Sequence, residues 1–142
     1  LGWAPPPGEP RAASGPPLGG LARSRDGGRS WRKFWSDYTR ASIVPPARPD
    51  LLLAGPAKAV GAQGRIEVSA DGGDSWRPAA DGIETPMPDM VDLFIAAPDG
   101  SIWAICSQGR LLRAEPGEWR WRSPLPANAD VRVKSASVLA EA

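Results

Sequence analysis

Histidine is absent from this chain of 142 residues, and cysteine and tyrosine each occur once. Without histidine, the chain holds no Ser-His-Asp or Cys-His nucleophile system, no histidine-ligated zinc and no histidine pH switch of its own. The single cysteine, Cys106, has no partner within the chain for a disulfide and lies in an apolar run. We therefore expect a buried thiol with a structural role.

The charge balance and the short apolar runs argue against two classes of partner. The chain has 17 basic and 16 acidic residues, a net charge of +1, so it lacks the overall positive field that attracts nucleic acid. No apolar run reaches the roughly 18 residues that a membrane-spanning helix needs. We predict neither nucleic-acid binding nor a membrane span. Because the chain begins at Leu1 and shows no signal-peptide pattern, we expect a processed product or a piece of something longer.

Proline and glycine are abundant instead, with 17 Pro and 16 Gly. Both residues break helices and favour turns, so the composition predicts an all-β fold of short strands. The two residue types are densest near the start of the chain, and residues 1–20 are predicted to form a Pro/Gly-rich linker or poorly ordered arm. A polyproline ligand for a partner is the less favoured interpretation of that arm.

An internal repeat of 45 residues organises the rest of the chain. Trp31, Trp76 and Trp121 are spaced by 45 residues. Residues 24–32 read SRDGGRSWR and residues 69–77 read SADGGDSWR, so the two segments differ at only two positions. Residues 114–122 keep Gly117, Trp121 and the final Arg but have lost the Ser and the Asp. Residues 24–31, 69–76 and 114–121 are called the first, second and third box below.

A period near 45 residues fits four short antiparallel strands, which is the unit of a β-propeller blade. Alternating and apolar segments predict strands near residues 42–44, 50–54, 65–69, 90–95, 101–106, 110–113 and 119–122. The predicted propeller segment, residues 21–142, divides into a blade remnant (21–36), two blades (42–79 and 90–125) and a further strand (131–139). Since closed propellers have about four to eight blades, these repeats predict a partial or open propeller.

The box residues suit a tight turn between two strands. An Asp side chain accepts hydrogen bonds from backbone N–H groups of the turn, paired glycines permit positive φ, and serine hydroxyls extend the network. The tryptophan is predicted to bury its ring between neighbouring sheets while its N–H bonds to the turn. The residues with these structural roles are Ser24, Asp26, Gly27, Gly28, Ser30 and Trp31, and Ser69, Asp71, Gly72, Gly73, Ser75 and Trp76.

Calcium binding is the functional alternative to this structural role for the carboxylates of these turns. Calcium needs several converging oxygen ligands, whereas each box offers only one or two carboxylates. The second carboxylate of the second box, Asp74, is replaced by Arg29 in the first box. We therefore predict no metal site and no cofactor.

The first and second boxes match the Asp-box, S-x-D-x-G-x-[ST]-W, and the chain resembles the BNR (sialidase-like) repeat family of β-propellers over about residues 19–125. That family includes exo-sialidases, glycosyl-hydrolase-like propellers, sortilin-type receptors and photosystem II stability/assembly factor-like proteins. The resemblance implies that the boxes lie on outer hairpins, away from a central ligand pocket, and are not catalytic. It also favours an extracytoplasmic location, whether periplasmic, lumenal or secreted.

The sequence lacks the constellation of a sialidase. Such an enzyme needs an arginine cluster, a tyrosine nucleophile assisted by glutamate, and an aspartic acid. The family's early arginine motif is missing, and Tyr38 does not match the family's catalytic tyrosine. Glu84, Asp89 and Asp92 are interpreted as a solvated acidic loop cluster. We predict a non-catalytic scaffold for binding or assembly; the alternative is a fragment of a sialidase-like or glycosyl-hydrolase-like propeller whose catalytic residues lie outside this chain.

Arginines of the third repeat are the candidate binding residues. Arg120 and Arg122 alternate with Trp119 and Trp121, so one face of that segment is predicted to be cationic and the other aromatic. Exposure to solvent and stacking on tryptophan are the simpler explanation. A docking face for a protein or an acidic glycan is the functional hypothesis, formed by Arg110, Arg113, Arg120 and Arg122. Further blades or self-association would be needed to close the ring.

Overall fold

The computed structural model describes residues 11–14, 20–126 and 128–137. These residues form eleven strands and no helix, which confirms the all-β class predicted from the proline and glycine content. A helix with the length and apolar character to cross a membrane is correspondingly not found in the described ranges.

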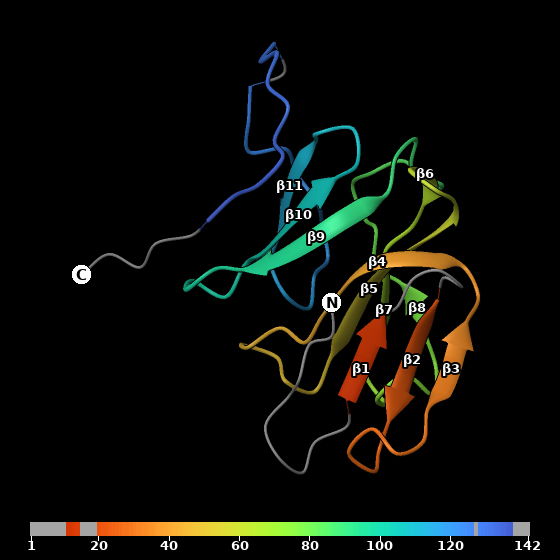
Figure 1. The fold of residues 1–142 in the computed structure, drawn as a ribbon. Coiled ribbons are helices and arrows are strands. Elements are labelled where there is room, and N and C mark those ends of the chain that lie inside the picture. The colour runs from red at the N-terminus through yellow and green to blue at the C-terminus, as the bar shows by residue number, and fades with distance from the viewer. Residues whose placement is uncertain (1–10, 15–19, 127, 138–142) are drawn as a thin grey trace.

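The strands form three antiparallel sheets that follow one another along the chain (Figure 1). The first sheet has the order β1 (Arg11–Ser14), β2 (Leu21–Ser24), β3 (Arg32–Trp35). The middle sheet has the order β4 (Tyr38–Ile43), β5 (Leu52–Ala59), β7 (Glu67–Ser69), β8 (Arg77–Pro78), and β6 (Ala62–Gly64) also pairs with β5. The third sheet contains β9 (Val91–Ala96), β10 (Ile102–Cys106) and β11 (Leu111–Ala114) in chain order.

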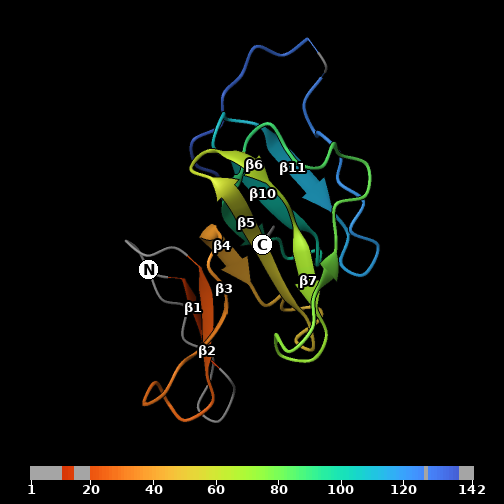
Figure 2. The same cartoon turned by 90° about the vertical axis from the view of Figure 1, so that its right-hand side faces the viewer.

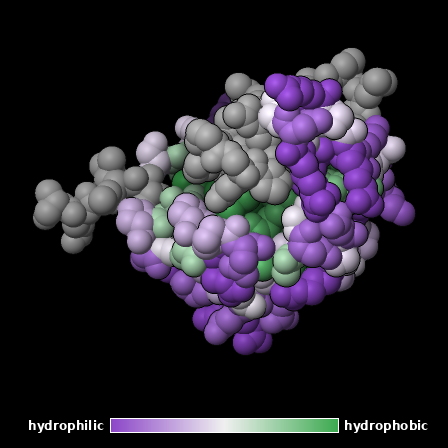
Figure 3. Space-filling view, turned by 90° about the horizontal axis from the view of Figure 1, so that it is seen from below, coloured by the Kyte–Doolittle hydropathy of each residue, from purple (hydrophilic) through white to green (hydrophobic). Residues whose placement is uncertain are grey.

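Strand β4 links the three sheets, because it contacts β9 of the third sheet and β1 of the first sheet. By its pairing with β2, strand β1 takes the place of β5 and β10, the second strands of the other two sheets. Figure 2 shows the first sheet nearly edge-on beside the middle sheet. On the face seen in Figure 3, strongly apolar surface lies in a central hollow, and hydrophilic residues lie around much of it.

The sequence period is also a period of the structure. The outer strand pair of the first sheet has Arg23 opposite Arg32, and the middle sheet has Val68 opposite Arg77, 45 residues later. The third repeat has Arg113 opposite Arg122 after another 45 residues, as a bridge with two backbone hydrogen bonds of 2.9 Å. The fourth strand predicted at residues 119–122 is therefore reduced to this bridge and a parallel bridge from Arg120 to Asp81, but the register of Arg122 is that of the other two repeats.

Two apolar clusters hold the sheets together. The larger one joins the middle and third sheets and includes Leu53, Ile66 and Trp121. The smaller one joins the first and middle sheets around Leu21. Cys106, on β10, belongs to the larger cluster and is buried, which confirms the predicted structural thiol, and its burial raises its pKa to about 12.

Two segments differ from the sequence prediction. Arg11–Ser14, assigned to the arm, forms strand β1, because its backbone pairs with β2 over the register Arg11 opposite Ser24 to Ser14 opposite Leu21. Such long-range pairing depends on a partner strand that local composition does not reveal. The strand predicted at 131–139 is absent from the described part, residues 131–137, where the backbone makes a single bond of 2.9 Å from Val133 to Gly109. Residues 138 and 139 lie outside the described ranges.

Candidate functional site

The first and second boxes form the same hydrogen-bonded turn. In the first box, Asp26 accepts bonds from the Ser30 backbone N–H at 2.8 Å, from the Ser30 hydroxyl and from the Ser24 hydroxyl at 2.8 Å. Ser24 Oγ in turn accepts the Gly28 N–H at 2.7 Å. Both turn glycines have positive φ, 75° at Gly27 and 94° at Gly28, a conformation that glycine adopts without the strain of a Cβ.

The second box repeats this geometry closely. Asp71 accepts the Ser75 N–H at 2.8 Å and the Ser69 hydroxyl at 2.7 Å, and Ser69 Oγ accepts the Gly73 N–H at 2.7 Å. Gly73 combines a φ of 95° with a close approach, since a Cβ at this position would overlap the ring of Phe34 in the first sheet. Any larger residue at position 73 would therefore disturb both the turn and the junction with the first sheet.

The hydrogen bonds of the two turns stabilise the ionised carboxylates. The Ser30 hydroxyl and backbone N–H, with Ser24, lower the pKa of Asp26 to about 2, and Ser75 and Ser69 lower that of Asp71 still further. Both side chains are thus anions at neutral pH whose oxygens are occupied by their own turns. Their chemistry is that of a structural acceptor rather than a proton donor.

We expect the free energy of unfolding to stay constant from neutral pH down to about pH 4 and to fall between about pH 4 and pH 2. The pKa values of Asp26 and Asp71 lie below the ordinary aspartate value of 3.8, so in this window the unfolded chain binds more protons than the folded chain. Protonation therefore favours unfolding as the pH falls. Urea titrations at stepped pH would measure this slope.

The control for this pH dependence is the double variant Asp26→Asn with Asp71→Asn, which removes both titrating groups from the turns. Its slope between about pH 4 and pH 2 should be shallower than that of the unaltered chain, with Asp99 leaving a residual slope because Ser101 lowers its pKa to about 2. An unchanged slope in the double variant would contradict the account of the turns.

The box tryptophans bond to their own turns but differ in exposure. Trp31 Nε1 donates to the Gly28 carbonyl at 3.1 Å, and Trp76 Nε1 donates to the Gly73 carbonyl at 3.0 Å. Trp76 is half-buried, with Trp35 of the first sheet edge-on to it at 4.4 Å between ring centroids.

The prediction that both box tryptophans are buried is wrong for Trp31, which is 49% exposed. Trp76 obtains its cover from Phe34 and Trp35, which belong to the preceding sheet. Trp31 is in the first sheet, and the described residues provide no equivalent cover for it. The burial of a box tryptophan thus depends on the neighbouring sheet and not on its own box.

The degenerate third box also joins two sheets, but it uses different bonds. Gly117 keeps positive φ at 93°, and Trp121 is buried. Trp121 Nε1 donates 2.7 Å to the carbonyl of Ala79 in the middle repeat instead of to its own turn. The Trp121 backbone N–H donates 2.8 Å to the carbonyl of Asp81. In both the second and the third box, the tryptophan therefore packs against the preceding repeat.

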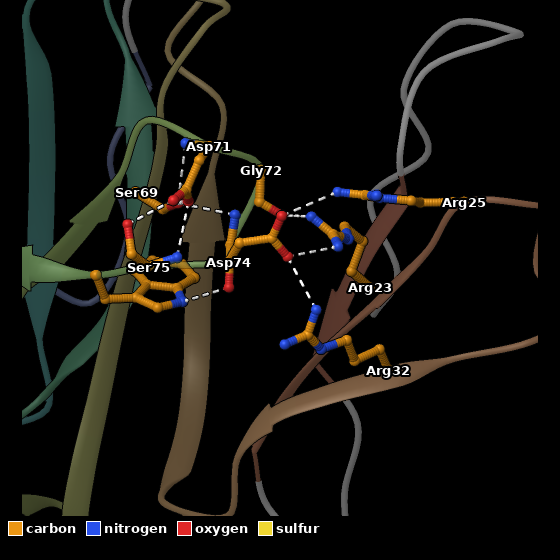
Figure 4. A network of polar contacts seen from close by, with 10 residues as sticks. Arg23, Arg25, Arg32, Ser69, Asp71, Gly72, Asp74 and Ser75 are labelled. Atoms are coloured by element: carbon orange, nitrogen blue, oxygen red, sulfur yellow. Dashed lines mark hydrogen bonds and ion pairs between the residues drawn. The ribbon is translucent and has the colours of Figure 1, made fainter.

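A charged contact joins the second box to the first sheet (Figure 4). Asp74 accepts bonds from Arg23 at 2.9 Å, Arg32 at 3.0 Å and Arg25 at 3.2 Å. Arg23 is 4% exposed, donates also to the Gly72 carbonyl, and lies over the ring of Phe34 with its guanidinium carbon 5.4 Å from the centroid. We call Asp74 with Arg23, Arg25 and Arg32 the clasp. From the sequence alone Asp74 is only a poor candidate metal ligand, and its partners in the first sheet are not apparent.

The four arginines of the predicted docking face do not lie together. Arg110 forms a bidentate pair with Asp89, at 2.9 Å from Nε and 2.6 Å from Nη2, and Asp89 is fully buried. The interpretation of Asp89 as solvated surface is therefore wrong, because Arg110 compensates its charge within the fold. Asp92 lies on β9 and not in a loop, and it pairs with Arg40 at 2.8 Å. Only Glu84 of the predicted acidic cluster is simply exposed.

The other three arginines, Arg113, Arg120 and Arg122, line one open cleft of about 380 Å³ at the outer edge of the third repeat. Trp119 and Trp121 are buried while Arg120 and Arg122 are exposed, as the alternating sequence predicted. Ala114, Glu115, Glu118, Ser123 and Pro124 complete the lining, so the cleft carries charges of both signs. We call it the basic cleft because its arginines outnumber its carboxylates.

The ion pairs of the basic cleft leave one arginine available. Arg113 pairs with Asp99 at 3.0 Å and with Glu115 at 2.8 Å, and it lies over Trp103. Arg120 is 3.6 Å from Asp81. Within the described ranges Arg122 has no ion pair. The described residues also contain no group of three or more His, Cys, Asp or Glu side chains arranged to hold a metal ion.

The three antiparallel sheets and their repeated turns define blades of the β-propeller type. No family model and no curated protein matches the sequence. Two solved propeller structures are similar in fold. An ancestral GH74 enzyme matches 87% of this chain with a TM-score of 0.68 at 15% identity. YCF48 from Cyanidioschyzon merolae matches 86% with a TM-score of 0.55 at 19% identity. The chain spans 18% and 42% of those two proteins, respectively.

Proposed function

We propose that this chain is a non-catalytic Asp-box propeller segment that serves as a scaffold for binding or assembly. The observation that supports this function most directly is the use of the box residues. Asp26 and Asp71, the most distinctive residues of the repeat, direct their carboxylates into their own turns. Trp76 and Asp74 then attach the second turn to the preceding sheet. The repeated motif thus builds and joins blades.

The surface offered to a partner is the basic cleft. Arg120 and Arg122 are exposed at the outer edge of the last repeat, and Arg122, which has no ion pair within the described ranges, presents its guanidinium to a carboxylate or sulfate. An acidic protein segment or an acidic glycan carries suitable groups. The Asp-box resemblance favours an extracytoplasmic location. In such a location the chain would meet both acidic proteins and acidic glycans.

A glycosyl-hydrolase-like propeller is the second candidate function, supported by the fold likeness to the GH74 enzyme. In that case this chain would contribute blades, and catalytic carboxylates would come from elsewhere in the protein. The box turns have the same structural role in either case, so they do not distinguish the two functions.

Assays of the complete gene product for hydrolysis distinguish the scaffold from the enzyme. We expect no release of fluorophore from a fluorogenic sialoside or from a panel of neutral fluorogenic glycosides, with a known sialidase as positive control. Sustained turnover of any of these substrates, abolished by heating the protein, would reject the scaffold and favour the hydrolase.

A further inference from the structure

The basic cleft of the third repeat corresponds to a surface of the first sheet. On the first sheet, the second box covers that surface. The first sheet carries Arg23 on β2 directly opposite Arg32 on β3. The third repeat carries Arg113 on β11 directly opposite Arg122, 90 residues later and in the same register. Strand β2 covers residues 21–24 and strand β11 covers residues 111–114, so each end of β11 lies 90 residues after the corresponding end of β2. The same pair of arginines therefore stands at the same place on two blades.

On the first sheet this arginine pair holds the second box. Asp74 lies within 2.9 Å of Arg23 and 3.0 Å of Arg32, and Trp76, two residues later, packs on Phe34 and Trp35 of the same sheet. The occupant is thus a hairpin turn that presents a carboxylate and an indole together. On the third repeat the corresponding arginines line the basic cleft, and Arg122 has no ion pair in the described ranges.

We propose that the basic cleft binds an acidic box hairpin of a separate partner chain, a turn with a carboxylate at the position of Asp74 and a tryptophan at the position of Trp76. This inference rests on the proposed scaffold function and names the partner class for its cleft. The incoming carboxylate bonds to Arg122 and shares Arg113, as Asp74 does with Arg32 and Arg23. The indole then covers the segment at Pro124, the position equivalent to Phe34.

Charge complementarity argues against a second copy of this chain as the occupant. The first box is the exposed box, and its Trp31 is available for docking. However, the residue equivalent to Asp74 in that box is Arg29, which would meet the guanidinium groups of Arg113 and Arg122. Like charges brought together at an interface disfavour the wrong partner. The cleft therefore selects an acidic turn over the chain's own basic one.

One difference from the first sheet weakens the cleft. Glu115 occupies the position of Arg25, and its carboxylate already pairs with Arg113 at 2.8 Å. The clasp on the first sheet has three arginines around one carboxylate, while the three equivalent positions in the cleft hold Arg113, Arg122 and the competing acid Glu115. The variant Glu115→Arg recreates the complete set and should strengthen binding of an acidic turn.

The direct test measures binding of a fluorescein-labelled, backbone-cyclised peptide with the sequence of residues 67–78, EVSADGGDSWRP, to the 142-residue chain by fluorescence anisotropy. The matched peptide replaces the second aspartate by arginine, as in the first box. We expect the acidic peptide to bind about tenfold more tightly than the arginine peptide. Arg122→Glu should abolish the preference and Glu115→Arg should increase it several-fold.

Arg77→Glu provides the control, because Arg77 is the exposed equivalent of Arg122 on the middle sheet and carries the same change in charge. It should leave binding of the acidic peptide unaltered. Equal binding of the acidic and arginine peptides would overturn the proposal. Hydrolysis is assayed separately, so the two proposals can fail independently. A scaffold whose cleft does not select acidic turns shows neither turnover nor a preference for the acidic peptide. A hydrolase with a functional cleft shows both turnover and that preference.

A second experiment builds the acidic turn into the first box of the folded protein itself. Its result therefore does not depend on the conformation of a free peptide. Arg29→Asp gives the exposed first box the carboxylate of the second box beside the exposed Trp31. We expect the unaltered chain to sediment as a monomer and Arg29→Asp to associate head to tail, box into cleft. Adding Arg122→Glu should restore the monomer. A monomeric Arg29→Asp at high protein concentration would overturn the proposal, as would self-association of the unaltered chain through its cleft.

Discussion

Replacing Arg110 by alanine is expected to lower the free energy of unfolding by about 3–5 kcal/mol, because removal of one partner leaves a buried charge uncompensated. Asp89 is fully buried, and both of its carboxylate oxygens accept bonds from Arg110. The surrounding backbone is tightly packed, since the Asp89 carbonyl accepts the Gly64 N–H at 2.9 Å and a Cβ on Gly64 would meet the same oxygen. The Arg110 side chain is itself 38% exposed, so water offsets part of the uncompensated charge and places the loss at the lower end of this range. Urea unfolding monitored by tryptophan fluorescence would measure the loss.

Two further variants separate the ion pair from the packing of the arginine. Arg110→Lys keeps the positive charge but loses the bidentate geometry, and it should cost clearly less than alanine. The double variant Asp89→Leu with Arg110→Met removes both charges and should recover most of the stability lost in Arg110→Ala. A loss below about 1 kcal/mol in Arg110→Ala would instead place Arg110 among ordinary surface cations.

The three box tryptophans should differ in their effects on stability, although the sequence places them at equivalent positions. Trp121→Ala removes a buried ring and its 2.7 Å bond to Ala79, and we expect a loss of about 3–5 kcal/mol. Trp76→Ala removes a half-buried ring packed on Trp35, and we expect about 2 kcal/mol. Trp31→Ala should cost less than about 1 kcal/mol, because the ring is 49% exposed.

The ranking follows from cover by the preceding sheet, and chemical denaturation of the three single variants measures it. A variant at Trp103, a half-buried tryptophan of β10 outside the boxes, serves as a control for the general effect of losing an indole. If Trp31→Ala destabilised the chain as strongly as Trp121→Ala, the box itself and not the junction between sheets would be the stabilising unit.

The local features of the fold were predictable from the sequence because they depend on short-range chemistry. The glycine pair of each box requires positive φ, and the flanking Ser and Asp are the residues that satisfy a turn's own N–H groups. The alternation of Trp119 and Trp121 with Arg120 and Arg122 likewise predicted which side chains face the core. The period of 45 residues then located the blades, since the cross-strand registers repeat with it.

The interactions between distant residues were not predictable in the same way. Arg110 and Asp89 are 21 residues apart, and nothing in either local segment marks the pair as buried. Strand β1 depends on pairing with β2, and the exposure of Trp31 depends on which sheet stands beside it. One feature of the sequence does point to the clasp: two otherwise similar boxes have Arg29 and Asp74 at equivalent positions. This difference can be interpreted only when the positions of the arginines in the neighbouring sheet are known.

The clasp offers the most direct test of the central claim that box turns join successive blades. A double-mutant cycle between Arg23→Met and Asp74→Asn isolates their coupling from the effects of each single change. Arg23 is buried while Asp74 is 42% exposed, so we expect a coupling of about 1 kcal/mol, above the typical value for two exposed residues. The matched cycle between Arg25→Met and Asp74→Asn, whose arginine is 62% exposed, should give a coupling near zero. A coupling near zero in the Arg23 cycle would contradict the account, because the second box would then contact the first sheet without holding it.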